Sequence, residues 1–152
     1  MLLFSIVLLT SCVSSKSAKA ELPFTSENLE GRWALRSLAK KIEEDDKVVK
    51  EYDHKIPRSF RIQYIFKKRD TIEYLSYRPA WANKSEEEEF IESSGLYEMA
   101  DRQIIFKIEG KENVVNNVLV FNRKEMHLQV ISEYTENGIH YKSTIVRRYE
   151  KI

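Results

Sequence analysis

The sequence of 152 residues contains only 1 cysteine, 3 prolines and 4 glycines. A single cysteine excludes an internal disulfide framework and any metal site built from several cysteines. With so little glycine and proline, the turns must be made by Asp, Asn, Lys and Glu. Charge of one sign is also not in surplus, because 25 Lys and Arg residues oppose 24 Asp and Glu residues. A general nucleic-acid binder needs a clustered basic excess and is therefore not expected.

Catalytic and metal-binding motifs are missing as well. The chain has no glycine-rich phosphate loop and no G-x-S-x-G nucleophile motif. None of the three histidines (His54, His127 and His140) has a second ligand at metal spacing, and we interpret His127 and His140 as surface residues. The run 86–89 of four glutamates is interpreted as a solvated charge run rather than a Ca²⁺ site. We therefore predict no enzyme, no metal and no cofactor.

The chain does contain enough apolar surface for one folded domain. Apolar residues make up 42% and aromatic residues 11% of the sequence, which excludes a wholly disordered chain. A chain of this size buries roughly 68–70% of its unfolded surface, which suffices for a core without disulfides or metals.

The N-terminus is typical of an export signal. Residues 1–10 are apolar and uncharged, yet ten helical residues span only about 15 Å, too short for a membrane anchor. The end of this segment and the two residues after it, Leu9-Thr10-Ser11-Cys12, resemble the lipobox of bacterial lipoproteins. That resemblance implies cleavage before Cys12, lipid attachment (palmitate) to it, and a protein of the bacterial cell envelope held at a membrane. The alternative is a buried free cysteine.

These features divide the chain into three parts. Residues 1–11 form the predicted lipoprotein signal peptide. Residues 12–21 form the lipidated cysteine and a flexible tether of small polar residues, and residues 22–152 form the folded domain.

From residue 59 onward the apolar pattern has a period of two, which indicates half-buried strands. Such runs occupy residues 59–66, 71–77, 104–108, 114–121, 126–130 and 139–149. Asn137-Gly138, between two of them, is a strong hairpin signal. We predict an all-β domain of about eight to ten short antiparallel strands, an up-and-down barrel.

Two stretches leave alternatives open. Residues 26–46 fit either a helix or a strand, and we expect a short helix or turn up to Glu30 followed by a strand. Residues 79–93, which hold Trp81, fit either a loop or a short helix.

Gly31-Arg32-Trp33, at the start of the first expected strand, resembles the G-x-W motif of lipocalins and of bacterial lipocalin-like (calycin-type) domains. The run Gly95-Leu96-Tyr97 is similar to a mid-barrel strand of such lipoproteins. The resemblance implies that Trp33 packs across one barrel end against an arginine of the last strand, for which we choose Arg147 over Arg148. A guanidinium stacked on an indole contributes about 0.5–2 kcal/mol.

A barrel of this size either fills with side chains or holds one small ligand. Buried tyrosines bring hydroxyls that need partners, so a mostly apolar pocket with a few polar groups is one expectation and a plain core is the other. The candidate ligand-lining residues are Phe60, Ile62, Tyr64, Phe66, Tyr74, Phe106, Leu128 and Tyr141.

The resemblance thus implies a lipid-anchored envelope protein whose barrel binds a small hydrophobic or amphipathic ligand. The alternative is a packed barrel without a cavity that binds another envelope protein. Trp81 and the loop around it are then the candidate contact, because exposed tryptophans often mark interfaces.

Overall fold

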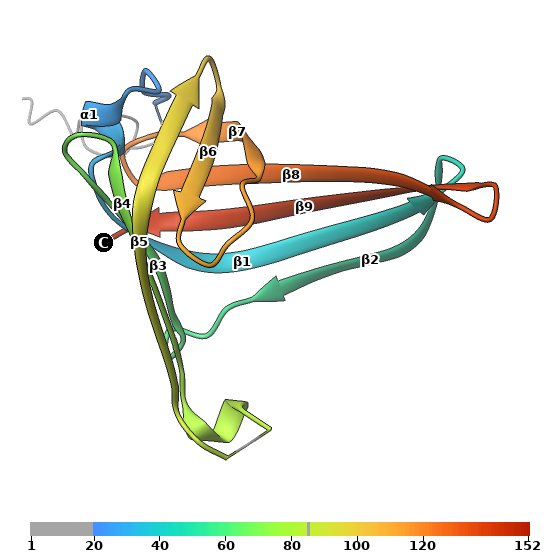
Figure 1. Cartoon of the computed structure of the whole chain (residues 1–152), viewed down its shortest axis with the longest axis horizontal. Helices are drawn as coiled ribbons and strands as arrows, with labels where there is room; N and C mark the ends of the chain where they lie inside the picture. The colour runs from blue at the N-terminus through green and yellow to red at the C-terminus, as the bar shows by residue number, and fades with distance from the viewer. Residues whose placement is uncertain (1–19, 85) are drawn as a thin grey trace, which may run out of the picture.

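The computed structural model describes residues 20–84 and 86–152, and in them the chain forms a closed antiparallel β-barrel (Figure 1). The predicted signal peptide, Cys12 and most of the tether lie outside the described residues. Nine strands are present in the described part, together with a short helix before the first strand and one 3₁₀ turn. They are α1 (Ser26–Leu29), β1 (Gly31–Glu44), β2 (Lys47–Lys55), β3 (Arg61–Lys67), β4 (Thr71–Arg78), η1 (Ala80–Ala82), β5 (Glu89–Ala100), β6 (Gln103–Ile108), β7 (Val115–Phe121), β8 (Glu125–Glu136) and β9 (Ile139–Lys151). The predicted fold class is confirmed.

Eight of these strands close the ring and the ninth lies outside it. From β3 to β9 each strand pairs with the next, and β1 pairs with β9 from Trp33–Lys151 to Glu44–Tyr141. On its other edge β1 changes partner along its length: residues 31–34 pair with β3, and residues 37–44 pair with β2. A β-bulge at Arg36 separates the two segments, and such bulges bend a strand.

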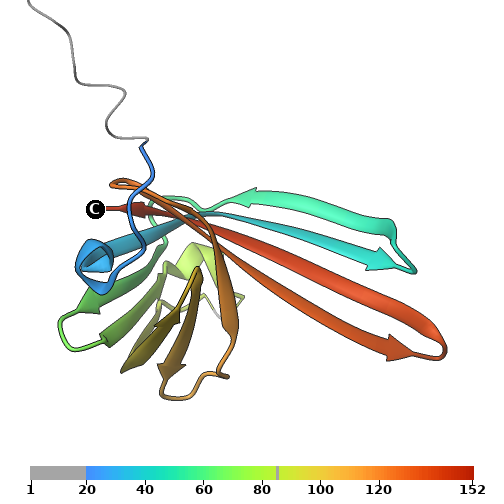
Figure 2. The same ribbon diagram turned by 90° about the horizontal axis from the view of Figure 1, so that it is seen from above.

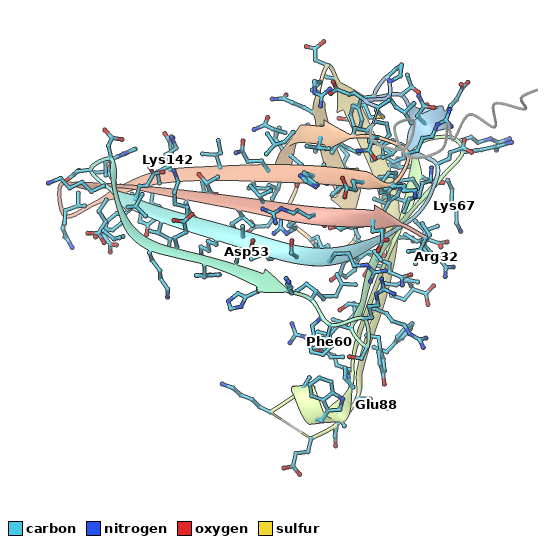
Figure 3. All side chains as sticks on the ribbon, turned by 180° about the vertical axis from the view of Figure 1, so that it is seen from behind. Arg32, Asp53, Phe60, Lys67, Glu88 and Lys142 are labelled. Carbon is cyan, nitrogen blue, oxygen red and sulfur yellow. The ribbon has the colours of Figure 1, made fainter. Side chains whose placement is uncertain are left out.

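Beyond the closed ring the sheet divides into two extensions (Figures 1 and 2). We call the first the arm: it consists of β2, residues 37–44 of β1, residues 130–136 of β8 and residues 139–147 of β9. We call the second the prong: it consists of the ends of β3, β4 and β5 that lead to η1. Figure 3 shows Asp53 and Lys142 on the arm, and Phe60 and Glu88 on the prong. The ring is closed at one end and flares at the other.

The hairpins use residues other than glycine at positions that demand a positive φ. Both central residues have positive φ at Asp45-Asp46, Arg69-Asp70 and Asn137-Gly138. This is the combination that a two-residue type I′ hairpin requires, and its twist matches that of the strands. Of the six central residues in these three turns only Gly138 is a glycine, which agrees with the low glycine content of the sequence.

The helix–strand ambiguity of residues 26–46 is resolved as expected, with α1 ending at Leu29 and β1 beginning at Gly31. Residues 79–93 contain η1 and the first part of β5. Strand β2 was not predicted, because its side chains are nearly all exposed and show no burial alternation. Among the described residues, none of the helices has the length and apolar character needed to span a bilayer.

The closed end of the barrel is a dry core. Leu29, Trp33, Phe121, Met126 and Leu128 are all 0% exposed. The Trp33 indole Nε1 donates a hydrogen bond of 2.8 Å to the carbonyl of Leu29, the last residue of α1. The ring also lies 5.8 Å from that of Phe121. This hydrogen bond, accepted by the last residue of α1, holds the helix over the closed end.

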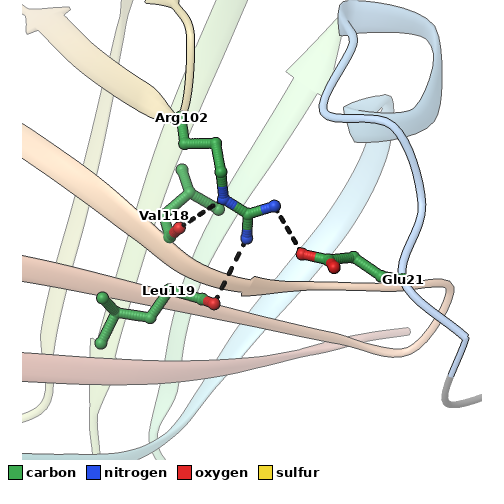
Figure 4. A network of polar contacts seen from close by, with 4 residues as sticks. All are labelled: Glu21, Arg102, Val118 and Leu119. Carbon is green, nitrogen blue, oxygen red and sulfur yellow. Dashed lines mark hydrogen bonds and ion pairs between the residues drawn. The ribbon is translucent and has the colours of Figure 1, made fainter.

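The segment before α1 is held against the same end (Figure 4). Arg102, in the β5–β6 turn, donates to the carbonyls of Val118 (3.1 Å) and Leu119 (3.3 Å) and pairs with the carboxylate of Glu21. Glu21 also forms an isolated bridge with Asn122. These contacts attach the N-terminal segment to β7.

Candidate functional site

The flared end of the ring contains a cavity. Its volume is ≈ 460 Å³, and it is open to solvent on one side. Side chains from strands β1, β3, β4, β6, β7, β8 and β9 and from the β6–β7 loop surround it. They are Leu35, Ile62, Tyr64, Tyr74, Phe106, Ile108, Lys111, Glu112, Val114, Asn116, Val130, Arg147 and Tyr149.

Three tyrosines and Phe106 form the aromatic part of this wall, and strand alternation places them there. Tyr64 of β3 and Tyr74 of β4 are cross-strand partners, so their side chains share one face, and the ring centroids are 5.4 Å apart. Tyr64 also contacts Phe106 (4.6 Å) and Tyr149 (5.6 Å). Strands from opposite sides of the ring therefore meet at Tyr64.

Burial raises the pKa of two hydroxyls in this wall, those of Tyr64 and Tyr149. Burial is the main cause that raises the pKa of Tyr64 to about 12, and the nearby guanidinium of Arg147 opposes this shift. Burial likewise raises the pKa of Tyr149 well above its usual value. At neutral pH the wall thus presents the neutral hydroxyls of Tyr64 and Tyr149 beside the side chains of Arg147, Lys111 and Glu112.

The charged groups of the site come from β9 and from the β6–β7 loop. Arg147 is half-buried among the tyrosines. In the loop, the Lys111 ammonium lies 3.7 Å from the centre of the Tyr74 ring, the geometry of a cation–π contact. Glu112 of the same loop also lines the cavity. The loop therefore covers part of the opening and is held to the wall through Lys111.

The eight predicted ligand-lining residues fall into four places: the cavity wall, the closed-end core, the prong and the arm. Ile62, Tyr64, Tyr74 and Phe106 line the cavity. Phe66 and Leu128 lie deeper, 2% and 0% exposed, in the closed-end core.

Phe60 and Tyr141 are corrections to the prediction, because neither reaches the cavity. Phe60 precedes β3, and its ring packs 5.6 Å from that of Trp81 on the prong. Tyr141 lies far out on the arm, stacked 5.1 Å from Tyr134. Both have the correct alternation, but they lie where the strands have left the ring.

The predicted pairing of Trp33 with Arg147 is also corrected. Trp33 does lie at the closed end, but the cation over its indole is Lys151, whose Nζ is 5.2 Å from the ring. Lys151 is directly opposite Trp33 in the β1–β9 register, whereas Arg147 is opposite Leu38. Arg147 therefore points into the cavity at the other end of the ring.

Several residues of the site were missed by the sequence reasoning. Tyr149 follows the same alternation as Tyr141 and Arg147, so its place in the interior was detectable. Leu35 precedes a bulge, which breaks the alternation of β1. Lys111 and Glu112 come from a loop, and no periodic pattern assigns loop residues to a cavity. Within the described residues, no three His, Cys, Asp or Glu side chains cluster as a metal site would require.

No protein-family model matches the sequence, and no curated protein matches it either. Solved structures with a similar fold include an uncharacterized protein from Bacteroides eggerthii, with 17% identity over 81% of this chain and 98% of that chain and a TM-score of 0.46. A deswapped triple mutant of bovine odorant-binding protein has 12% identity over 82% of this chain and 74% of that chain, with a TM-score of 0.44. The bovine protein in complex with its natural ligand has 12% identity over 88% and 77% of the two chains, with a TM-score of 0.42. These likenesses concern the fold alone, which the strand pairing of this chain establishes by itself.

Proposed function

We propose that the protein is a binding protein rather than an enzyme, and that its cavity holds one small hydrophobic or amphipathic molecule. We further propose that a lipid on Cys12 anchors the protein to a membrane of the bacterial cell envelope. The first proposal rests on the cavity, and the second on the N-terminal sequence.

The observation that carries the binding proposal is that the cavity has both the volume and the wall chemistry of a small-molecule site. A space of ≈ 460 Å³ falls within the roughly 300–1,000 Å³ typical of ligand sites. Most of the wall is apolar or aromatic, and a few polar groups line it. They are the hydroxyls of Tyr64, Tyr74 and Tyr149, the guanidinium of Arg147, and the side chains of Lys111, Glu112 and Asn116. An apolar wall with few orienting polar groups is typical of small-molecule sites.

The test is native mass spectrometry of the full chain, purified directly from the cells that make it. We expect an excess mass that is released on denaturation, in contrast to the covalent lipid on Cys12, which remains. The variant Val130→Trp fills the cavity and should lose this excess mass. The matched control is Ile131→Trp, because Ile131 is the next residue of β8, is 43% exposed and does not line the cavity.

A bare mass that stays bare after incubation with fatty acids and extracted envelope lipids would contradict the binding proposal. So would an adduct that survives in Val130→Trp. In either case the open side of the cavity is simply a solvated gap in a packed barrel.

The anchor has its own prediction. Cys12→Ser removes the sulfur to which the lipid would be attached, so we expect the variant to leave the membrane fraction or to run as an uncleaved precursor on a gel. A variant that stays membrane-bound with unchanged mobility would show that the resemblance to a lipobox is misleading.

One observation favours a second function, the docking of a partner protein on the prong. Trp81 is 72% exposed and Phe90 is 64% exposed, and Phe60 packs against Trp81. Large exposed aromatic side chains are enriched at the centres of interfaces. If this surface binds an envelope protein, Trp81→Ala should abolish capture of that protein in a cross-linking experiment without changing the mass of any cavity ligand.

A further inference from the structure

The inner face of the arm continues the wall of the cavity. Cross-strand partners share a face, so the register identifies the side chains on the same side as Arg147. Leu38 is opposite Arg147, Lys40 is opposite Ile145, and Ile42 is opposite Ser143. One strand further out, Lys40 is opposite Tyr52 and Ile42 is opposite Lys50. Arg147, Lys40 and Lys50 therefore lie on one face of the sheet.

These three cations form a diagonal row. Lys40 is one diagonal step from Arg147, and Lys50 is one diagonal step from Lys40. Diagonal neighbours in a sheet are about 7–8 Å apart. The row starts in the cavity, where Arg147 is half-buried, and ends at Lys50, which is exposed. It leads outward from the ligand site along the arm.

On the opposite face of the arm, three cations form ion pairs. There, Lys41 pairs with Glu43 (3.1 Å), Lys142 with Glu133 (3.7 Å) and Arg148 with Asp53 (3.3 Å). On the inner face, in the part of the chain that the structure describes, none of the three cations has a carboxylate within 4.0 Å. On the outer face Lys41, Lys142 and Arg148 thus have carboxylate partners. None of the three inner-face cations has one among the described residues, although the Lys50 ammonium lies 5.7 Å from the centre of the Tyr52 ring.

Acidic groups near the row are few and lie at its ends. Glu112 lines the cavity from the β6–β7 loop, and Glu44 lies at the far tip of the arm opposite Tyr141. The side chains between the cations are Leu38, Ile42, Tyr52 and Ile145, which are apolar or aromatic. A half-buried cation without a counter-ion is costly, and a bound anion removes that cost.

We propose that the ligand is an amphiphile with a multiply charged anionic headgroup, such as a phosphate ester, whose tail enters the cavity and whose headgroup lies against Arg147, Lys40 and Lys50. This rests on the proposed function and specifies its ligand class. Arg147 orients the headgroup at the mouth by charge-assisted hydrogen bonds, and the two lysines extend the positive surface to solvent. A neutral or singly charged headgroup leaves part of the row unused.

The test compares three probes with the same tail, each used below its critical micelle concentration. They are dodecyl maltoside, tridecanoate and dodecyl phosphate, each with a twelve-carbon alkyl chain, titrated calorimetrically into the full chain at constant salt. We expect dodecyl phosphate to bind tightest and dodecyl maltoside weakest, with roughly a tenfold step in affinity for each additional ion pair that the headgroup forms. Inorganic phosphate alone should bind far more weakly than dodecyl phosphate.

Matched variants on one strand localise the effect. Lys40→Gln should weaken dodecyl phosphate binding roughly tenfold and leave dodecyl maltoside unchanged. Lys41→Gln, one residue along β1 on the outer face, should leave both affinities within about twofold. Because both positions are on the solvated arm, both variants are expected to fold.

The outcomes separate the two proposals. If none of the three amphiphiles binds, the cavity is not a ligand site and both proposals are overturned. If all three bind equally, or if Lys40→Gln and Lys41→Gln behave alike, the proposed function stands and the headgroup inference is overturned. Inorganic phosphate that binds as tightly as dodecyl phosphate would overturn it too, because the tail would then contribute nothing.

Discussion

The two ends of the barrel are built from the same strands but differ in how completely side chains fill their interiors. At the closed end the Trp33 indole donates to Leu29, and the surrounding side chains are fully buried. At the open end Tyr64, Tyr149 and Arg147 line a cavity that is open to solvent, and Arg147 forms no ion pair within the described residues. The closed end is filled by its own side chains, although the buried Tyr97 hydroxyl there has no hydrogen-bond partner among the described residues, and the open end has room for another molecule.

The difference originates in the sheet. Every strand at the closed end belongs to the ring, so inward side chains meet other side chains. At the open end β1 exchanges β3 for β2 after the bulge at Arg36, and the arm and the prong separate. Inward side chains there face a gap rather than a neighbour. An apolar, inward-facing position therefore becomes core or cavity wall according to whether the ring is still closed at that level.

The largest expected effect concerns the closed end. Trp33→Ala removes a fully buried indole and its hydrogen bond, so the free energy of unfolding should fall by roughly 3–5 kcal/mol. Trp81→Ala is the control, because Trp81 is 72% exposed and its loss should stay within about 0.5 kcal/mol. Urea unfolding measures both. A loss below about 1 kcal/mol for Trp33→Ala would mean that the closed end is not a packed core.

The boundary between the two ends depends on a close approach of β5 and β6. A Cβ atom at Gly95 would lie 2.0 Å from the Lys107 carbonyl oxygen, which is backbone and cannot move aside. Gly95→Ala should therefore lower the free energy of unfolding by about 1–3 kcal/mol. Ser94→Ala, on the exposed side of the same strand, should change it by less than about 0.5 kcal/mol. Equal stabilities of the two variants in urea would show that the strands are not so close.

The open end should show itself in the pH dependence of stability. The Tyr64 hydroxyl has its pKa raised by burial to about 12, and an unfolded tyrosine loses its proton near pH ~10. Above that pH the folded chain holds more protons than the unfolded chain, so the free energy of unfolding should fall as the pH rises from about 10 towards 12. Tyr64→Phe removes this contribution and should flatten the slope. Urea unfolding at several pH values measures this slope. If the free energy of unfolding falls equally with pH in the unchanged protein and in Tyr64→Phe, the Tyr64 hydroxyl is in contact with water.

The smallest expected effect concerns the loop over the cavity. Lys111→Ala removes the cation–π contact with Tyr74, and the free energy of unfolding should fall by no more than about 1 kcal/mol. Dissociation of a bound amphiphile, followed by stopped flow, should nevertheless become faster. Lys68→Ala, in the exposed β3–β4 turn, is the control. A large loss of stability with unchanged dissociation would mean that the loop is part of the core rather than a cover.

Much of the fold could be predicted from the sequence because the strands of the ring alternate. Ile104, Phe106 and Ile108 point inward as their spacing indicates, and Asn137-Gly138 forms the predicted hairpin with positive φ at both residues. Strand β2 could not be found in this way. It lies outside the ring and exposes almost every side chain, so neither face of the strand requires apolar residues.

The site could be predicted only in part, because alternation gives the side of a strand and not the level along the barrel. Phe60, Tyr64 and Phe66 share one alternation, yet they lie on the prong, in the cavity wall and in the core. Arg147 was placed on the correct face and at the wrong end, since the register with β1 depends on the bulge at Arg36. The level of a residue along the barrel is determined by strand pairing between segments that are distant in the sequence, which alternation does not reveal.

The pairing of β1 with β9 also determines when the protein can fold during its synthesis. Trp33 pairs with Lys151, so the first strand of the ring cannot be completed before β9 has been made. Proteins dominated by such distant pairings fold slowly, in about milliseconds to seconds. A chain that ends before the 13 residues of β9 leaves both β1 and β8 as unpaired edges, and unpaired edges recruit other chains. Truncated products of this protein should therefore be prone to aggregation even though they contain nearly all of the core.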